Sequence, residues 1–175
     1  MRTFKRTRAR RRRIIAAVKR ILVALLLLAV AACSSQSSPA AFTLGTARVD
    51  AKYACPAGST DAKYDVHATV VAHNSTAKDV TIEAATAEMT LAAVSGTWLE
   101  KVGDRYAAGT VKVTPTMVAH NSDRTLDVTI PSSCTSGRNA SAKSSSGSYT
   151  VTIYMATTAG AFSVKAGNRH EIVAS

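Results

Sequence analysis

From Phe42 to the end of the chain, apolar and polar residues alternate in short segments that are separated by turn-forming residues. The alternation is clearest in three segments, at 64–72, 125–130 and 149–155. A period of two places successive side chains on opposite faces of an extended strand, whereas an amphipathic helix needs a period near 3.6. The sequence therefore predicts half-buried β-strands in this region, and it contains no long amphipathic helical pattern.

Weaker strand candidates lie at 47–54, 79–91, 97–101, 109–114, 161–165 and 172–174, the last as a short edge strand. The 79–91 candidate changes the parity of its apolar positions, which predicts a bulge or bend, although its Ala and Glu content would also tolerate a helical turn. Pro115 and Pro131 each follow a strand candidate. Because proline lacks the N–H that a ladder needs, we expect strand pairing to end at both positions.

Seven to nine short strands with frequent turns are typical of two antiparallel sheets packed face to face. A closed barrel is less favoured, because residues 135–148 form a long Ser-, Gly- and Lys-rich segment that we expect to be a loop. The fold class predicted for residues 42–175 is an all-β, immunoglobulin-like two-sheet antiparallel sandwich in a single domain.

The first 33 residues have a different character. Residues 1–20 carry ten Lys or Arg and no acidic residue, and residues 21–33 read ILVALLLLAVAAC. A basic region, an apolar run and small residues, in this order, are typical of an export signal. The twelve residues between Arg20 and Cys33 are fewer than the roughly 20 that a membrane-spanning helix requires, which disfavours a retained anchor. An ordinary secretory signal cleaved after Ala29-Val30-Ala31 is a further alternative.

Val30-Ala31-Ala32-Cys33 resembles the lipobox of bacterial lipoprotein precursors. The resemblance implies that residues 1–32 are a signal peptide and that Cys33 receives lipid and begins the mature chain. It also implies a protein held by lipid at the extracytoplasmic side of the cell membrane. Residues 33–41 then comprise the lipidated cysteine and a Ser-rich tether, whose eight flexible residues span roughly 15 Å.

The chain contains three cysteines. If Cys33 carries lipid, as the lipobox resemblance implies, Cys55 and Cys134 remain as a pair, and we expect them to form a disulfide in an oxidising compartment. Tyr53-Ala54-Cys55 superficially resembles the Tyr-x-Cys motif of immunoglobulin strands. In that family the motif holds the second cysteine, whereas here it holds the first of the pair. The immunoglobulin-like expectation therefore concerns architecture and not family membership.

A pentapeptide occurs twice: VAHNS stands at 71–75 and again at 118–122. Each copy is followed within a few residues by DVTI, at 79–82 and at 127–130. Asn and Ser supply turn chemistry between alternating apolar segments. The repeat therefore predicts one strand-turn-strand unit used twice in a pseudo-symmetric sandwich.

The charge distribution bears on possible partners. The chain has 22 Lys and Arg against 11 Asp and Glu, but ten of the basic residues lie in residues 1–20, which leaves 12 against 11. A nearly neutral domain does not offer the basic surface that nucleic acid requires. The expected partners are the membrane, through the lipid on Cys33, and an envelope protein or glycan of unknown identity.

No sequence motif for nucleophilic, zinc-protease, dithiol, phosphate-loop or calcium-loop chemistry is present. We therefore expect a non-catalytic binding or interaction module without a cofactor. A metal handler is one alternative: His73 and His120 occupy equivalent positions in the repeat, and Met89 or Met117 would complete a soft copper site. The favoured interpretation of both histidines is a solvated side chain at a turn, with no metal. A hydrolase with an unmarked site is the other alternative.

Two aromatic residues are the candidates for a binding surface. Trp98 is either a recognition residue or, as favoured, part of the core, because large aromatic side chains serve in both places. Tyr106 is expected on a loop and more exposed than Trp98.

Overall fold

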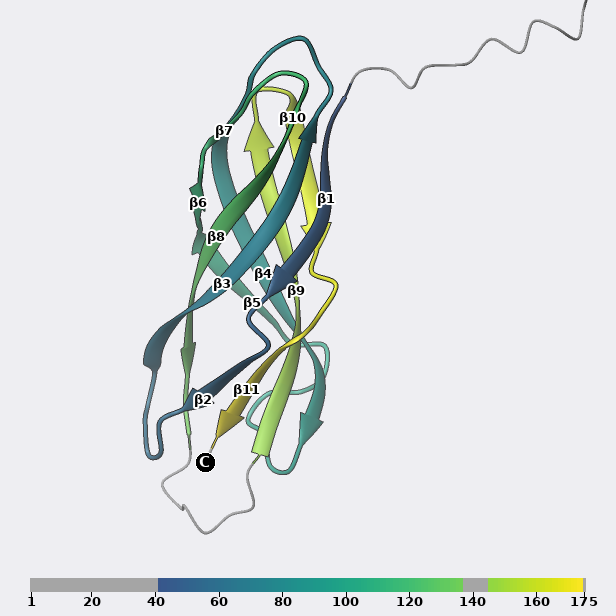
Figure 1. The fold of residues 1–175 in the computed structure, drawn as a ribbon. Helices are drawn as coiled ribbons and strands as arrows, with labels where there is room; N and C mark the ends of the chain where they lie inside the picture. Colours follow the sequence, from purple (N-terminus) through teal and green to yellow (C-terminus); the bar gives the residue numbers. More distant parts are fainter. Residues whose placement is uncertain (1–40, 137–144, 175) are drawn as a thin grey trace, which may run out of the picture. The chain divides into compact units, whose positions relative to one another are not determined.

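The computed structural model describes residues 41–136 and 145–174, which contain eleven strands and no helix. The strands form two facing sheets within one compact unit, Ala40–Ser175 (Figure 1). The prediction of an all-β, immunoglobulin-like sandwich is therefore confirmed. The predicted signal peptide, Cys33 and all of the predicted tether except Ala41 lie outside the described residues.

Sheet A comprises, in spatial order, β1 (Phe42–Val49), β3 (Ala62–Asn74), β8 (Ser122–Cys134) and β6 (Lys112–Thr114). Sheet B comprises β2 (Lys52–Cys55), β11 (His170–Ala174), β9 (Ser145–Thr157), β4 (Val80–Ser95) and β5 (Arg105–Thr110). Two further strands join sheet B: β10 (Gly160–Lys165) pairs with β9, and β7 (Met117–Val118) pairs with β4. Every pairing is antiparallel except that of β11 with β2. Within the described residues, no helix has the length and apolar character needed to cross a membrane.

The core lies between the two sheets and follows the predicted alternation. On β3 and β8, which pair over thirteen residues, the buried side chains occupy every second position. The largest fully buried side chains are Met89, Leu91, Leu126, Ile130, Ile153 and Met155. Burying each such side chain stabilises the fold by about 1.5 to 3 kcal/mol relative to leaving it exposed. Because the apolar residues of a strand all lie on one face, their summed contribution decides which face is buried.

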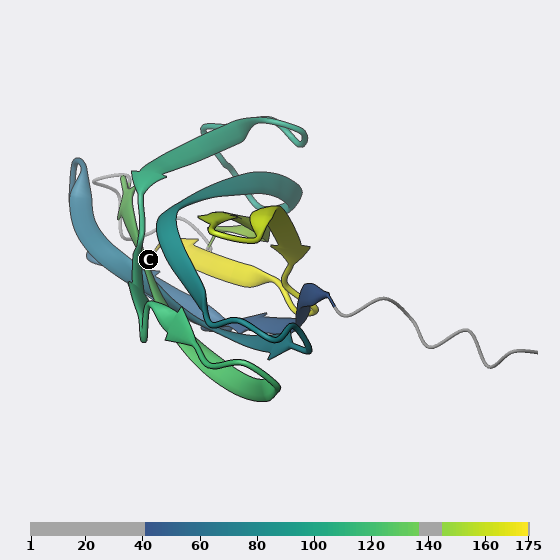
Figure 2. The ribbon, with the colours of Figure 1, turned by 90° about the horizontal axis from the view of Figure 1, so that it is seen from above.

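The two ends of the sandwich differ, and we name them by their contents. The repeat end holds the connection from β3 to β4 and the turn from β7 to β8, which contain the two VAHNS segments. Figure 2 views this end along the strands, with the two sheets on either side of the core. The disulfide end holds β2, β11 and the connection from β4 to β5.

Three of the weaker strand candidates differ from the observed strands. The 47–54 candidate is divided, because the chain turns at Asp50 and Ala51 and passes from β1 in sheet A to β2 in sheet B. The 109–114 candidate spans the end of β5 and all of β6. The 97–101 candidate is wrong, since it lies in the connection from β4 to β5. Gly96 and Gly103 have φ values of 70° and 100°, a left-handed conformation that ends extended structure on both sides.

The predicted irregularity in the 79–91 candidate is confirmed as a break in strand register. The pairing of β4 with β9 shifts between Ile82 and Ala84, and it shifts again between Leu91 and Ala93. β4 remains a strand through both positions, without the helical turn that its composition would tolerate. The bulges allow sixteen residues to follow a strongly twisted sheet.

The two prolines have different outcomes. Pro115 follows the last residue of β6, as predicted. Pro131 lies inside β8, where it pairs with Asp65 of β3, so the prediction that pairing ends there is wrong. The pairing of β6 with β8 has already stopped at Thr129. Beyond that residue β8 has a neighbour on one side only, and an edge strand tolerates the missing N–H.

Two predictions about the C-terminal part are also corrected. The segment at 172–174 is not at an edge, because β11 lies between β2 and β9 and pairs with both. Residues 145–148, predicted as part of a loop at 135–148, belong to β9. Pairing on both sides, with β4 and with β11, holds this Ser- and Gly-rich segment extended. Residues 135 and 136 are not in a strand, and residues 137–144 of that prediction lie outside the described residues.

The sequence repeat does not produce a structural repeat. The first VAHNS copy ends β3, and its Asn74 is 2% exposed. The second copy forms β7 and a turn, and its Asn121 is exposed with φ of 49°. Three residues separate VAHNS from DVTI in the first copy and four in the second. One added residue reverses the parity of the side chains, which is why the predicted pseudo-symmetric unit is not found.

Candidate functional site

The disulfide between Cys55 and Cys134 is present, as predicted, with an S–S distance of 2.14 Å and a Cα–Cα distance of 6.0 Å. Cys55 ends β2 in sheet B and Cys134 ends β8 in sheet A. Both residues are buried. The bond therefore joins the two sheets at the disulfide end.

Asn74 organises the repeat end. Its amide nitrogen lies within 3.1 Å of three carbonyl oxygens, those of Lys78, Val118 and Ala119. Its side-chain oxygen accepts hydrogen bonds from the backbone N–H and the hydroxyl of Thr76. This single buried side chain thus connects the turn between β3 and β4 with the second VAHNS segment.

The two histidines of the repeat lie at this end, but each has its own carboxylate partner. The Nδ1 atom of His73 is 2.8 Å from Asp123, and Nδ1 of His120 is 2.8 Å from Asp79. Both histidine side chains are substantially exposed, at 46% and 61%. Both are exposed histidines with one carboxylate partner each. His120 lies at the turn after β7, as the favoured interpretation expected, whereas His73 lies on β3 and not at a turn.

The methionines considered for a copper site lie apart from these histidines. Met89 is buried in the core near the disulfide end, where its sulfur is 4.0 Å from the Ser132 hydroxyl. Met117 is 52% exposed at the repeat end, on β7. Across residues 41–136 and 145–174, no group of three or more His, Cys, Asp or Glu side chains is arranged to hold a metal ion.

Trp98 anchors the β4–β5 loop, which we define as residues 96–104. Its indole packs against Gly147 of β9, and its Nε1 donates to the Tyr149 hydroxyl at 3.2 Å and to the Glu100 carboxylate at 3.3 Å. The Tyr149 hydroxyl also donates to Glu100. Burial and the Glu100 carboxylate together raise the pKa of Tyr149, which keeps its hydroxyl protonated. Trp98 is thus half-buried against the core, between the two predicted roles.

Backbone hydrogen bonds also hold the β4–β5 loop. Gly103 donates to the Leu91 carbonyl at 2.8 Å, and Leu91 donates back to the Asp104 carbonyl at 2.9 Å. The Asp104 carboxylate accepts from the Lys101 backbone N–H at 2.8 Å. These bonds fix the backbone of the loop against β4, which reduces the conformational freedom that a partner would have to restrict on binding.

The β4–β5 loop displays apolar side chains that have no cover in the described part of the chain. Leu99 is 83% exposed and Val102 is 59% exposed, the two highest values among the large hydrophobic residues described. Val94, on the adjoining end of β4, is 44% exposed. These exposed apolar side chains make the β4–β5 loop the candidate interaction surface of this end.

Gly147 gives a test of this anchoring. A Cβ atom added at Gly147 would lie 2.5 Å from the Trp98 indole, so we expect Gly147→Ala to displace the indole and lower the free energy of unfolding by about 1 to 3 kcal/mol. Because the chain has one tryptophan, its fluorescence reports the displacement directly, as a shift to longer wavelength. Gly167→Ala is the matched control, since its nearest neighbour would be a carbonyl oxygen 3.7 Å away. Equal emission spectra for the two variants would show that Trp98 does not pack on Gly147.

Tyr106 lies on β5 and not on a loop, which corrects the prediction of its position. It is 39% exposed and more exposed than Trp98, as predicted. Its hydroxyl is 3.5 Å from the Pro131 carbonyl, so it spans the gap between β5 of sheet B and the open edge of β8. This position protects an edge, which natural sheets commonly cover.

His170 is a buried polar residue of the disulfide end that sequence reasoning did not single out. It has no solvent exposure, and both of its ring nitrogens have partners. Nδ1 is 2.7 Å from the Asp50 carbonyl, and Nε2 is 3.2 Å from the Tyr64 hydroxyl. Tyr64 stacks on Tyr53 with a centroid distance of 3.7 Å, and burial raises the pKa of Tyr64 to about 12.

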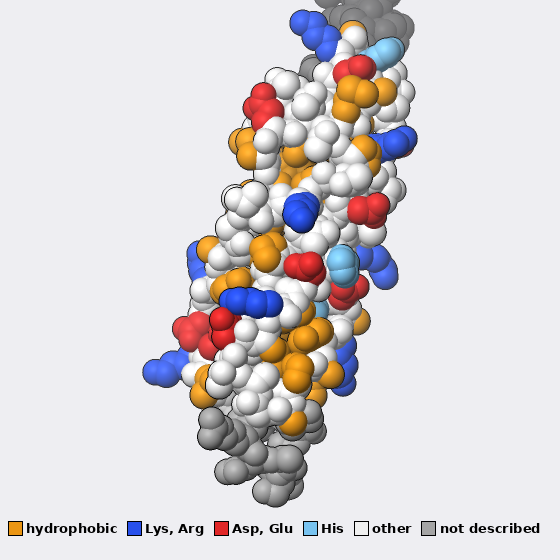
Figure 3. Space-filling model, turned by 90° about the vertical axis from the view of Figure 1, so that its left-hand side faces the viewer, with side chains coloured by type: hydrophobic (Ala, Val, Ile, Leu, Met, Phe, Trp, Pro, Cys, Tyr) orange, Lys and Arg blue, Asp and Glu red, His pale blue; other side chains and the backbone are white. Residues whose placement is uncertain are grey.

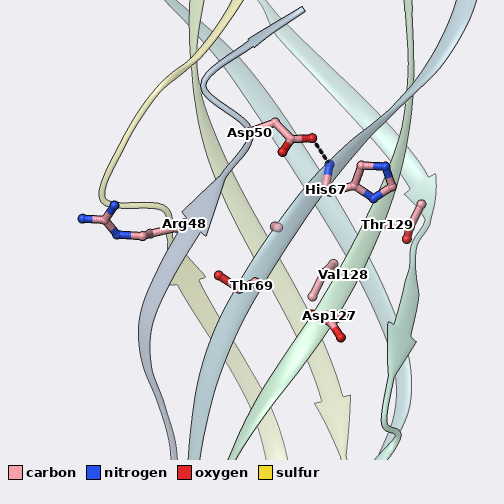
Figure 4. Close-up of a pocket in the computed structure, with 8 residues that line it drawn as sticks. Arg48, Asp50, His67, Thr69, Asp127, Val128 and Thr129 are labelled. Carbon is pink, nitrogen blue, oxygen red and sulfur yellow. Dashed lines mark hydrogen bonds between the residues drawn. The ribbon is translucent and has the colours of Figure 1, made fainter.

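A shallow depression of about 240 Å³ lies on the outer face of sheet A (Figure 4). It is lined by Arg48, Asp50, His67, Ala68, Thr69, Asp127, Val128 and Thr129. Asp50 accepts a hydrogen bond from the His67 backbone N–H at 2.9 Å, and Arg48 points away from the other side chains (Figure 4). Every polar side chain there is exposed or half-buried. The depression is therefore a solvated strand face without converging groups.

The side of the sandwich seen in Figure 3 carries basic and acidic side chains scattered among uncharged ones. No large field of one sign is visible on that face. An interspersed pattern gives little long-range attraction for a polyanion.

No protein-family model matches the chain, and no curated protein matches it in sequence. Solved structures that resemble it include the ASH/PapD-like domain 7 of human CEP192, with 8% identity, TM-score 0.28 and coverage of 81% of this chain and 91% of that one. AggA, the major subunit of aggregative adherence fimbriae type I from Escherichia coli, has 9% identity, TM-score 0.31 and coverage of 77% and 95%. The VesB protease of Vibrio cholerae has 9% identity and TM-score 0.22, and the match covers 73% of this chain and 32% of that one. Likenesses at this level assign no function to the chain.

Proposed function

We propose that this chain is a bacterial lipoprotein, held at the membrane by lipid on Cys33, whose sandwich is a non-catalytic binding module. The β4–β5 loop is its working surface. The observation that carries the proposal is the display of Leu99 and Val102 on a loop fixed by Trp98. Leaving such side chains in water has a free-energy cost, and binding a partner removes it.

The direction in which the loop faces supports this assignment. The proposed tether joins the sandwich at the repeat end, because Phe42 at the start of β1 pairs with Asn74 at the end of β3. The β4–β5 loop follows the other end of β4, sixteen residues away. At about 3.3 Å per residue, this strand spans roughly 50 Å. The loop is therefore presented away from the point of attachment, where a partner can approach it.

The alternative functions have no comparable support. Metal handling through His73 and His120 would need further ligands, and each of these histidines already bonds a carboxylate. A hydrolase would need a nucleophile in contact with a base. The Glu100 carboxylate, which could serve as such a base, instead accepts hydrogen bonds from Trp98 and Tyr149 and holds the loop in place.

Site-specific photocrosslinking in the bacterium that makes the protein tests the working surface. A photoreactive residue replaces Leu99 in one strain and Met117 in a second strain. Met117 is the matched control, because it is also apolar and exposed but lies at the repeat end. We expect one discrete adduct from position 99 and none from position 117. No adduct at 99, or the same adduct at both positions, would contradict the assignment.

A further inference from the structure

His170 links three parts of the disulfide end. It begins β11, its Nδ1 bonds the turn between β1 and β2 at Asp50, and its Nε2 bonds Tyr64 on β3. Because the Asp50 carbonyl can only accept a hydrogen bond, Nδ1 carries the proton, and Nε2 accepts from the Tyr64 hydroxyl. Both ring nitrogens are therefore satisfied in the neutral imidazole. In the imidazolium the Tyr64 hydroxyl would have to turn from donor to acceptor, and the charge would lie on a ring with no solvent exposure.

Among the described residues, no carboxylate is hydrogen-bonded to the His170 ring. The titratable neighbours are Tyr64 on β3, whose hydroxyl bonds Nε2, and Tyr149 on β9, the ladder partner of His170, with Tyr53 of β2 stacked on Tyr64. The Asp50 carboxylate accepts from the His67 backbone N–H and favours the charged ring electrostatically, but this effect is smaller than that of burial. Glu171, the chain neighbour of His170, lies 4.0 Å from Lys52.

Burial lowers the pKa of His170 below its ordinary value of 6.5. The unfolded or opened chain therefore takes up this proton at a higher pH than the closed sandwich does. The stabilisation is complete above about pH 6.5 and declines as the pH falls below that value. Acidification therefore lowers the stability of the closed sandwich, because the folded state favours the neutral imidazole.

The strand that His170 begins is connected to the anchor of the β4–β5 loop. Gly147 of β9 pairs with Ile172 of β11 on one side and with Val94 of β4 on the other. Trp98 packs on that same glycine. In addition, Tyr149, the ladder partner of His170, donates to the Glu100 carboxylate that Trp98 also bonds. A change in the position of β11 therefore reaches Trp98 by two routes.

We propose that His170 is an acid-sensitive latch, in which protonation of its imidazole loosens β11 and thereby releases the β4–β5 loop. The inference rests on the proposed function in one respect, namely that this loop is the working surface. The disulfide still holds β2 to β8 when the latch opens. The change is therefore a local opening of one end, and not unfolding of the sandwich.

The test uses the intact protein in detergent and follows the emission of Trp98 between pH 7.5 and pH 5.0. We expect a red shift with a midpoint below pH 6.5 in the wild type, and none in His170→Gln. His67→Gln, at an exposed histidine on sheet A, is the matched control and keeps the shift. Glu100→Gln removes a group that holds Trp98, so its own emission at pH 7.5 is its reference. A shift with an unchanged midpoint in this variant separates protonation of His170 from protonation of the carboxylate at Trp98.

A second measurement avoids dependence on a variant that fails to fold. In the wild type, ring-nitrogen NMR of the histidines gives the midpoint of His170, which must coincide with that of the Trp98 shift. An unchanged Trp98 emission, or a shift that persists in His170→Gln, overturns the latch and leaves the neutral-pH crosslink at Leu99 unaffected. If Trp98 emission shifts with pH but position 99 gives no crosslink, the proposed function of the β4–β5 loop is wrong. The acid-sensitive opening then remains, without a binding surface for it to regulate.

Discussion

Replacing Cys55 and Cys134 together by alanine is expected to lower the free energy of unfolding by about 4 to 5 kcal/mol. The bond closes a loop of 79 residues, and its removal restores that conformational freedom to the unfolded chain. It also releases β2, whose only sheet partner is β11, from β8 in the opposite sheet. Urea unfolding followed by circular dichroism measures the change, and the slope of the transition should increase because the unfolded chain becomes more extended.

The wild-type protein treated with a reducing agent is the control for this double variant. It should unfold at the same urea concentration as the alanine variant, since both lack the same constraint. A loss below about 1 kcal/mol would mean that the unfolded chain keeps the two segments together without the bond.

Asn74→Ala is expected to lower the free energy of unfolding by about 2 to 4 kcal/mol, although it removes only one small side chain. The Asn74 amide donates to the carbonyls of Lys78, Val118 and Ala119, and the substitution removes these bonds together with the acceptor for Thr76 at a position that is 2% exposed. Asn74→Asp is expected to be similarly destabilising, because it keeps the acceptor oxygen for Thr76 but loses the donors. Thermal and urea unfolding of both variants provide the measurement.

Asn121 in the second VAHNS copy provides a matched control with the same sequence context. It is exposed and has a positive φ of 49°, a conformation that glycine adopts readily. Asn121→Gly should therefore change stability by no more than about 0.5 kcal/mol. If the Asn74 and Asn121 variants lost the same free energy of unfolding, the two copies of the repeat would be structurally equivalent, contrary to this account.

The parts of the fold that could be predicted from sequence are those with strong local patterns. Alternation identified β3, β8 and β9, because each has one face in the core and one in water. The parity change in β4 correctly indicated a bulge. The division of 47–54 between two sheets left no such signal, since the alternating pattern continues through the turn at Asp50 and Ala51.

The candidate site was harder to predict, because it depends on contacts between distant segments. The Cys55–Cys134 pair followed from counting cysteines once the lipobox resemblance was accepted. By contrast, Trp98 on Gly147 joins residues 49 positions apart, and His170 on Tyr64 joins residues 106 apart. Gly96 and Gly103 were the only local sign that residues between them form a loop and not a strand. The exposure of Leu99 and Val102 could not be read from their apolar character.

Intact-mass spectrometry of the protein extracted from the membranes of its own host tests the lipid anchor on which the proposed function depends. We expect a chain that begins at Cys33, carries acyl groups on that residue, and is two hydrogens lighter than its reduced form because Cys55 and Cys134 are joined. A chain that begins at another residue, or one with an unmodified Cys33, would contradict the proposal.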